Sequence, residues 1–266
     1  MHARTEPAEA QAEPDTSARP PLIREFLLVA GLFLVYKLGR RLAVGHTGAA
    51  FADARGVWRL ERALHLPHET AVQSALLHGG VLVRLANTYY ATVHFPATLA
   101  FLVWLYLRRP AHYVWARRVL AVVTTAALVL PFAFPLAPPR MLAGTGLVDT
   151  ARVYGPSVYG PPADDHLSNQ FAAMPSLHFG WALMVAVGLI AATRSRRRRL
   201  WLLHPLITLL VIVGTANHYW LDAAVAAVML GAALAVVPAP RRTATTARRG
   251  AGRPAAREAV PAGAVR

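Results

Sequence analysis

Two polar residues begin an otherwise apolar segment near the end of the chain. Asp222 is the only acidic residue between Asp165 and Glu258, and His218 precedes it by four positions. A charge in such a segment is costly, so a functional role is the first expectation. On one helix face the carboxylate can bind one ring nitrogen, which fixes the tautomer and makes the other nitrogen a nucleophile. The alternative is a structural pair that closes a helix end.

A second polar cluster, residues 173–178, begins another apolar run. Pro175 favours a first helical turn, where free backbone N–H groups can bind an anion. Ser176 can add a hydroxyl donor for a phosphate oxygen, and His178 can act as a general acid that protonates a leaving oxygen. A helix cap with an interfacial histidine is the alternative for this cluster.

A third cluster, Pro138-Pro139-Arg140-Met141, ends an apolar run with a rigid turn. The Arg140 guanidinium is suited to forked contacts with phosphate oxygens, although an arginine in this position is often only a membrane anchor. Together the three clusters supply a cation, two helix N-termini, two histidines and a carboxylate. Phosphoryl transfer requires such a set.

The elements that carry these clusters are long apolar runs. Of the 266 residues 55% are hydrophobic, and the mean hydropathy is +0.37. Because a helix needs about 20 residues to cross a bilayer, we expect an all-α fold, a polytopic membrane helix bundle of about six transmembrane helices. The expected spans are residues 26–44, 85–107, 119–135, 174–193, 200–216 and 219–237.

The remaining segments are expected to flank or cover this bundle. Residues 46–80 mix apolar and charged side chains, which favours an amphipathic segment in the membrane interface, although a surface loop with one short helix fits equally well. Residues 1–20 and 241–266 have the composition of disordered tails, the second one basic and cytoplasmic, on either side of one membrane phosphatase or phosphotransferase domain at 21–240.

The positive charge of the chain orients the predicted bundle. The net charge is +15, and its arginines gather in loops at positions 108, 109, 117, 118, 194 and 196–199 and in the last 26 residues. Cytoplasmic loops carry such an excess, so we expect a multi-pass protein of the cell membrane with both termini cytoplasmic and the three clusters extracytoplasmic. Lys37, Arg40 and Arg41 disagree, because they fall on the predicted outer side. No basic, aromatic-rich face accompanies the charge, which argues against a nucleic-acid partner.

With these motifs the chain resembles the type 2 phosphatidic acid phosphatase superfamily, and in detail its inositol-phosphorylceramide synthase-like (inositolphosphotransferase) branch. The resemblance spans roughly residues 80 to 235. It rests on Pro138-Pro139-Arg140-Met141, Ala172-Ala173-Met174-Pro175-Ser176-Leu177-His178 and Thr215-Ala216-Asn217-His218-Tyr219-Trp220-Leu221-Asp222.

The resemblance implies a catalytic role for three residues. His218 attacks phosphorus to form a phosphohistidine, Asp222 orients it, and His178 protonates the leaving group. The phosphate-binding residues implied are Arg140, Ser176 and Asn217. No metal and no other cofactor is implied.

The chain departs from the superfamily pattern where Ala133 and Ile212 replace a lysine and an arginine, and where Met141 replaces a proline. A clamp with fewer cations suits a phosphodiester better than a phosphate monoester. We therefore expect a membrane phosphotransferase that moves a phosphoryl or phospho-alcohol group from a lipid phosphate ester to a lipid or polyol alcohol. The alternatives are a lipid phosphate phosphatase, acting on phosphatidate or a prenyl phosphate, and a non-catalytic membrane binding protein of the same fold.

Two further regions have open roles in the sequence. Asn87, Tyr90 and His94 share one face of the second predicted span, where they could line a headgroup pocket or, as we favour, bond between helices. The loop 153–162 could cover the site or simply connect two spans. The other histidines lack acidic partners at ligand spacing, so no metal site is predicted.

Overall fold

The computed structural model describes residues 19–42, 47–156 and 171–240, and these residues form an all-helical fold. The all-α prediction is confirmed. The helices are α1 (Leu22–Leu42), α2 (Thr47–Ala63), α3 (Glu69–Leu77), α4 (Gly80–Thr92), α5 (His94–Arg108), α6 (Pro110–Ala133), α7 (Thr150–Tyr154), α8 (Leu177–Ala192), α9 (Leu203–Gly214) and α10 (Trp220–Val236), with 3-10 turns η1 (Pro139–Met141) and η2 (Arg196–Leu202). The predicted tails lie outside the described residues except for 19 and 20, as does the loop 153–162 after residue 156.

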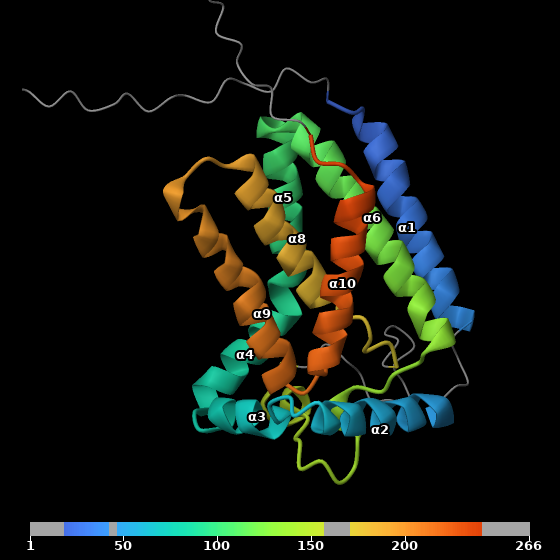
Figure 1. The fold of residues 1–266 in the computed structure, drawn as a ribbon, viewed down its shortest axis with the longest axis vertical. Helices are drawn as coiled ribbons and strands as arrows, with labels where there is room; N and C mark the ends of the chain where they lie inside the picture. The colour runs from blue at the N-terminus through green and yellow to red at the C-terminus, as the bar shows by residue number, and fades with distance from the viewer. Residues whose placement is uncertain (1–18, 43–46, 157–170, 241–266) are drawn as a thin grey trace, which may run out of the picture.

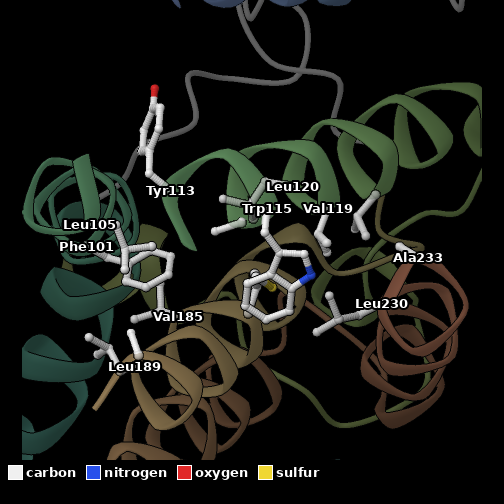
Figure 2. Packing of buried hydrophobic residues seen from close by; sticks show 14 residues of the cluster. Phe101, Leu105, Tyr113, Trp115, Val119, Leu120, Val185, Leu189, Leu230 and Ala233 are labelled. Atoms are coloured by element: carbon white, nitrogen blue, oxygen red, sulfur yellow. The ribbon is translucent and has the colours of Figure 1, made fainter. Parts of the chain in front are cut away.

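The long helices form a bundle, and α2 and α3 lie across one of its ends (Figure 1). Four helices, α5, α6, α8 and α10, share an apolar core (Figure 2). Trp115 from α6 is buried in it, and its indole nitrogen donates to the carbonyl of Val237 at the end of α10, 3.1 Å away. Gly188 of α8 allows the Phe101 ring of α5 to pack closely, because a Cβ there would lie 2.4 Å from Cζ of Phe101. A larger residue at 188 would displace this ring.

The predicted apolar runs correspond to helices, but α6 begins at Pro110 and not at residue 119, and two other runs are interrupted. The run 85–107 is divided at Val93 into α4 and α5, which are bent by 49°. Pro96 in the first turn of α5 has no N–H to continue the α4 ladder. The run 200–216 begins with the 3-10 turn η2 and becomes α-helical only at Leu203.

One helix in the described ranges, α6, is long and apolar enough to cross a membrane, and α4 with α5 makes a second if the bent pair counts as one span. α8 and α10 are apolar but have 16 and 17 residues. At 1.5 Å per residue these two fall short of a hydrocarbon core of roughly 30 Å. The number of six transmembrane helices therefore stays a prediction.

The predicted amphipathic segment, 46–80, forms two helices, α2 and α3. Along α2 the buried positions are Ala50, Ala54, Val57 and Glu61, one helical face that packs toward the bundle. Ala50 and Ala54 contribute to a second apolar cluster, with Leu136, Met174 and Tyr219 from the segments that carry the predicted motifs. α2 thus covers the end of the bundle where those motifs meet.

Candidate active site

His218 is held by its Nδ1 atom. This nitrogen lies 2.8 Å from the carbonyl oxygen of Ala173 and 3.1 Å from Oδ2 of Asp222. Two acceptors at Nδ1 place the ring proton there, so Nε2 keeps its lone pair. His218 is buried, with 6% of the residue exposed. The predicted pairing with Asp222 is present, and the Ala173 carbonyl adds to it.

Asp222 and His218 meet at a helix end and not on one helix face as predicted. α10 begins at Trp220 after the N-cap Tyr219, so His218 precedes the helix. Asp222 lies in the first turn, and its Oδ2 also accepts the backbone N–H of Tyr219 at 2.9 Å. The carboxylate therefore caps α10 and orients the imidazole with the same oxygen atom.

His178 lies in the first turn of α8 and faces His218, with ring centroids 6.1 Å apart. Two aromatic rings hold it. Tyr90 of α4 stacks on it at 4.3 Å and 19°, and His94 of α5 lies 4.4 Å away at 37°. These contacts fix the plane of the proposed general acid. The sequence left open the role of three residues on one helix face, and two of them, Tyr90 and His94, thus belong to the site.

Asn87, the third member of that face, holds a neighbouring segment. Its Nδ2 donates to the carbonyl oxygens of Thr150 and Gly155, both at 2.9 Å, and its Oδ1 accepts the Thr150 hydroxyl at 2.8 Å. Asn87 therefore fastens α7, and with it the described start of the loop 153–162, to α4.

Arg140 reaches the site from η1 and is 4% exposed at its side chain. Its backbone N–H donates to the carbonyl of Ala216 at 3.0 Å, and its Nη1 donates to Oδ1 of Asn217 at 2.5 Å. Its Nε lies 3.6 Å from Oδ2 of Asp149. The guanidinium is thus positioned beside the segment that carries His218, and Asp149 offsets part of its charge.

The other predicted phosphate ligands have structural contacts of their own. Asn217 donates through Nδ2 to the Thr215 hydroxyl at 2.8 Å, so its side chain is directed at protein atoms on both sides. Ser176 is the N-cap of α8 and accepts the N–H of Phe179 at 3.4 Å. Pro175 precedes this cap and does not occupy the first helical turn as predicted. The backbone N–H of Ser176 donates to the carbonyl of Asp222 at 3.1 Å, which joins the two motif segments.

The surroundings of His218 keep it neutral. Burial lowers the pKa of His218 to about 4, the Ala173 carbonyl opposes the shift, and the Arg140 guanidinium adds to it. At neutral pH the imidazole is unprotonated and can act as a nucleophile.

Within the described ranges, no three His, Cys, Asp or Glu side chains are grouped to hold a metal ion.

Some groups around the site could not be chosen from the sequence. The Ala173 carbonyl belongs to the main chain, so its residue type gives no signal. Asp149 and Arg140 are brought together by the path of the loop between them. Glu61 and Glu69 lie in the segment where the sequence showed mixed charge, and both are fully buried next to α10. Their burial, which no sequence pattern indicated, distinguishes them from ordinary surface carboxylates.

A family model described as the PAP2 superfamily matches residues 55–236. The chain belongs to the PAP2 superfamily. The match covers α3 to α10 and most of α2, and so includes all three motifs. Membership supports a phosphatase-like enzyme of lipid phosphate esters and confirms the predicted superfamily. The inositol-phosphorylceramide synthase-like branch remains a prediction. No curated protein and no solved structure matches the chain.

Proposed function

We propose that this enzyme is an integral membrane phosphotransferase that acts on lipid phosphate esters through a phosphohistidine on His218. The observation that carries the proposal is the pair of acceptors at Nδ1 of His218, the Ala173 carbonyl and the Asp222 carboxylate. They leave Nε2 as the attacking atom in an imidazole that is neutral at physiological pH. His178, whose ring lies near that of His218, and Arg140, which binds the adjacent Asn217, complete the set.

The reaction has two displacements at phosphorus. In the first, Nε2 of His218 forms a bond to phosphorus, the bond to the leaving oxygen breaks, and protonated His178 gives its proton to that oxygen. In the second, His178 takes the proton of an acceptor hydroxyl, the acceptor oxygen bonds to phosphorus, and the P–N bond breaks. Arg140 neutralises charge on the phosphoryl oxygens in both steps.

A phosphodiester is the donor that fits the charges of this site. Ala133 and Ile212 supply no cation where the superfamily pattern has one, and Ile212 is fully buried in apolar surroundings. The Arg140 guanidinium is shared with Asp149. A diester carries one negative charge and a monoester up to two, so the diester needs less positive charge. This supports transfer to a lipid or polyol alcohol over hydrolysis.

The outer surface supports a place in the membrane, with the site on the extracytoplasmic side. Large apolar side chains project outward along the bundle, such as Phe95, Leu99 and Val103 on α5, and Leu206 and Leu210 on α9. Exposed apolar surface of this extent is typical of a lipid-facing wall. The arginines of the α5 to α6 connection and of η2 lie at the end of the bundle opposite α2 (Figure 1). Such an arrangement favours cytoplasmic arginines.

The test is a transfer assay with purified enzyme in detergent or vesicles. Labelled phosphatidylinositol and a labelled prenyl phosphate are offered with and without a lipid alcohol. A transferase moves the labelled group to the alcohol, so that phosphatidylinositol gives a new phosphodiester and the prenyl phosphate gives a new phosphate monoester. Without the alcohol neither forms, and labelled His218 accumulates. If the only labelled products with every acceptor are inositol phosphate from the first donor and inorganic phosphate from the second, the enzyme is a lipid phosphate phosphatase, the alternative that uses the same residues.

A further inference from the structure

Two buried glutamates lie behind the proposed nucleophile, outside the residues assigned above. Glu61 is near the end of α2, Glu69 begins α3, and neither side chain is exposed. Arg62 lies beside both, with Nη2 3.0 Å from Oε2 of Glu69 and 3.9 Å from Oε2 of Glu61. One guanidinium is thus the neighbouring cation of two carboxyl groups. Buried acids are rare unless each is paired.

The first of these glutamates contacts the helix that carries Asp222. Oε1 of Glu61 accepts the backbone N–H of Leu221 at 2.9 Å, and Asp222 is the next residue. An N–H in the first turn of a helix has no partner within that helix, so an external acceptor fixes the turn. The contact continues through Oδ2 of Asp222 to Nδ1 of His218. Glu61 is therefore two steps from the proposed nucleophile.

The two carboxyl groups are neighbours, because Oε2 of Glu61 and Oε2 of Glu69 lie 3.9 and 3.0 Å from the same nitrogen, Nη2 of Arg62. A hydrogen bond between two carboxyl groups requires that one of them carries a proton. Oε2 of Glu61 and Oε1 of Glu69 are both buried, and neither has an N–H or hydroxyl donor among the described residues. A shared proton satisfies both oxygen atoms.

We propose that Glu61 is a positioning residue for the nucleophile: held in protonated form by Glu69, it binds the Leu221 N–H and so aligns Asp222 and His218. This inference rests on the proposed function of His218. Glu61 on α2 then sets the first turn of α10 from outside the bundle, without touching the substrate.

The proton on Glu61 makes the alignment sensitive to alkaline pH. Burial, the bond to Glu69 and the charges of Glu69 and Asp222 raise the pKa of Glu61 to about 9, while the Leu221 N–H opposes the shift. The titratable and charged groups that face it are Arg62 on α2, Glu69 on α3, and Tyr219 and Asp222 beside α10. Above that pH, Glu61 and Glu69 repel each other.

Two substitutions separate hydrogen bonding from charge. Glu61→Gln keeps an acceptor for Leu221 and a donor for Glu69, but it cannot ionise. Glu61→Leu keeps the volume and removes both contacts. The rate of phosphohistidine formation is measured from pH 6 to pH 10 with a labelled aryl phosphodiester, whose leaving group needs little proton from His178. We expect Glu61→Leu to lose at least about tenfold at pH 7 and Glu61→Gln to retain most of the rate. Wild type should decline above about pH 9, and Glu61→Gln should not.

Gln73→Leu is the matched control for a loss of buried contacts alone. Gln73 of α3 is buried, and its hydrogen bonds go to the carbonyl of Gly214 and to both backbone groups of Val148, which lie outside α10. This variant should unfold at lower temperature and keep the alkaline decline of wild type. An unchanged alkaline decline in Glu61→Gln, or a wild-type rate in folded Glu61→Leu, would overturn the inference.

A readout independent of turnover distinguishes this inference from the proposed function. Infrared difference spectra should show a protonated carboxyl band in wild type that disappears around pH 9 and is missing from Glu61→Gln at every pH. If this band is absent from wild type, Glu61 is not protonated and the inference fails, even if His218 becomes labelled. If the band is present and no substrate labels His218, the proposed function has failed and the positioning role falls with it.

Discussion

Two groups of buried carboxylates lie at opposite ends of the bundle and have opposite surroundings. At the end of the bundle where α1 begins, Glu25 accepts a hydrogen bond from the Tyr113 hydroxyl at 2.7 Å and another from Nη1 of Arg117. Both partners belong to α6. At the other end, Glu61, Glu69 and Asp222 crowd around one another with Arg62 as their neighbouring cation. The first group is balanced in charge, and the second has more acids than cations.

The difference shows what each end is suited to do. A carboxylate with a cation and a hydroxyl donor is fully satisfied and fastens α1 to α6. Acids that share too few donors must hold a proton, and that proton can be lost within an ordinary pH range. The first arrangement stabilises the fold, while the second can affect chemistry. The predictions below test this division, from the largest expected effect on turnover to the smallest.

His218→Ala should have the largest effect, because it removes the nucleophile at the crowded end. We expect turnover to fall on the order of 10⁴-fold or more, with no labelled histidine. The protein should remain folded, as judged by its unfolding temperature in detergent and its circular dichroism. A folded variant with wild-type turnover on any phosphate ester would contradict the assignment of His218.

His178→Ala should have an effect that depends on the leaving group. With a lipid alkoxide we expect a loss of about 10² to 10⁴-fold, because the leaving oxygen needs a proton. An aryl phosphodiester with an acidic phenol should be affected much less. The measurement is kcat for both substrates in wild type and variant. Equal losses on the two substrates would argue that His178 acts on something other than the leaving oxygen.

Acid should reduce the rate through His218. Its pKa is lowered to about 4, so the attacking nitrogen is free above that pH and protonated below it. For a phosphodiester donor, whose own charge is constant here, kcat/KM should fall about tenfold per pH unit below about 4. With an aryl phosphodiester, whose leaving group needs little proton from His178, this acid decline and the alkaline decline assigned to Glu61 bound a plateau. A decline beginning near pH 6.5 would indicate a histidine with an ordinary environment.

The sequence predicted the contacts of this candidate site where those contacts are local. His218 and Asp222 are four residues apart, and a helix start brings them together wherever the segment lies in the fold. The helices were predictable for the same reason, since each apolar run is continuous in the chain. The break at Val93 was missed because the apolar run continues through it and the bend depends on Pro96.

Contacts between distant segments could not be predicted. Glu61 and Leu221 are 160 residues apart, and a glutamate in a charged amphipathic segment resembles one that faces water. The same applies to Asp149 beside Arg140 and to Tyr90 stacked on His178. Each depends on the packing of helices, for which one sequence contains no pairing signal. The sequence therefore indicated the chemical groups of the site but not the residues that hold them.

Glu25→Gln should have the smallest effect on turnover and a clear effect on stability. The substitution keeps the size of the side chain and removes the charge that Arg117 binds, and both partners are largely buried. Losing a charge-assisted hydrogen bond of this kind costs about 2 kcal/mol of unfolding free energy. Because Glu25 lies at the end of the bundle opposite the site, kcat should stay within about twofold of wild type.

Unfolding in detergent and kcat are measured on the same preparation, with Arg117→Gln and the double variant completing a cycle. The double variant should be less destabilised than the sum of the two, since it leaves no unpaired charge. A tenfold loss of kcat in folded Glu25→Gln would break the division between the two ends, because it would couple the balanced carboxylate to the chemistry.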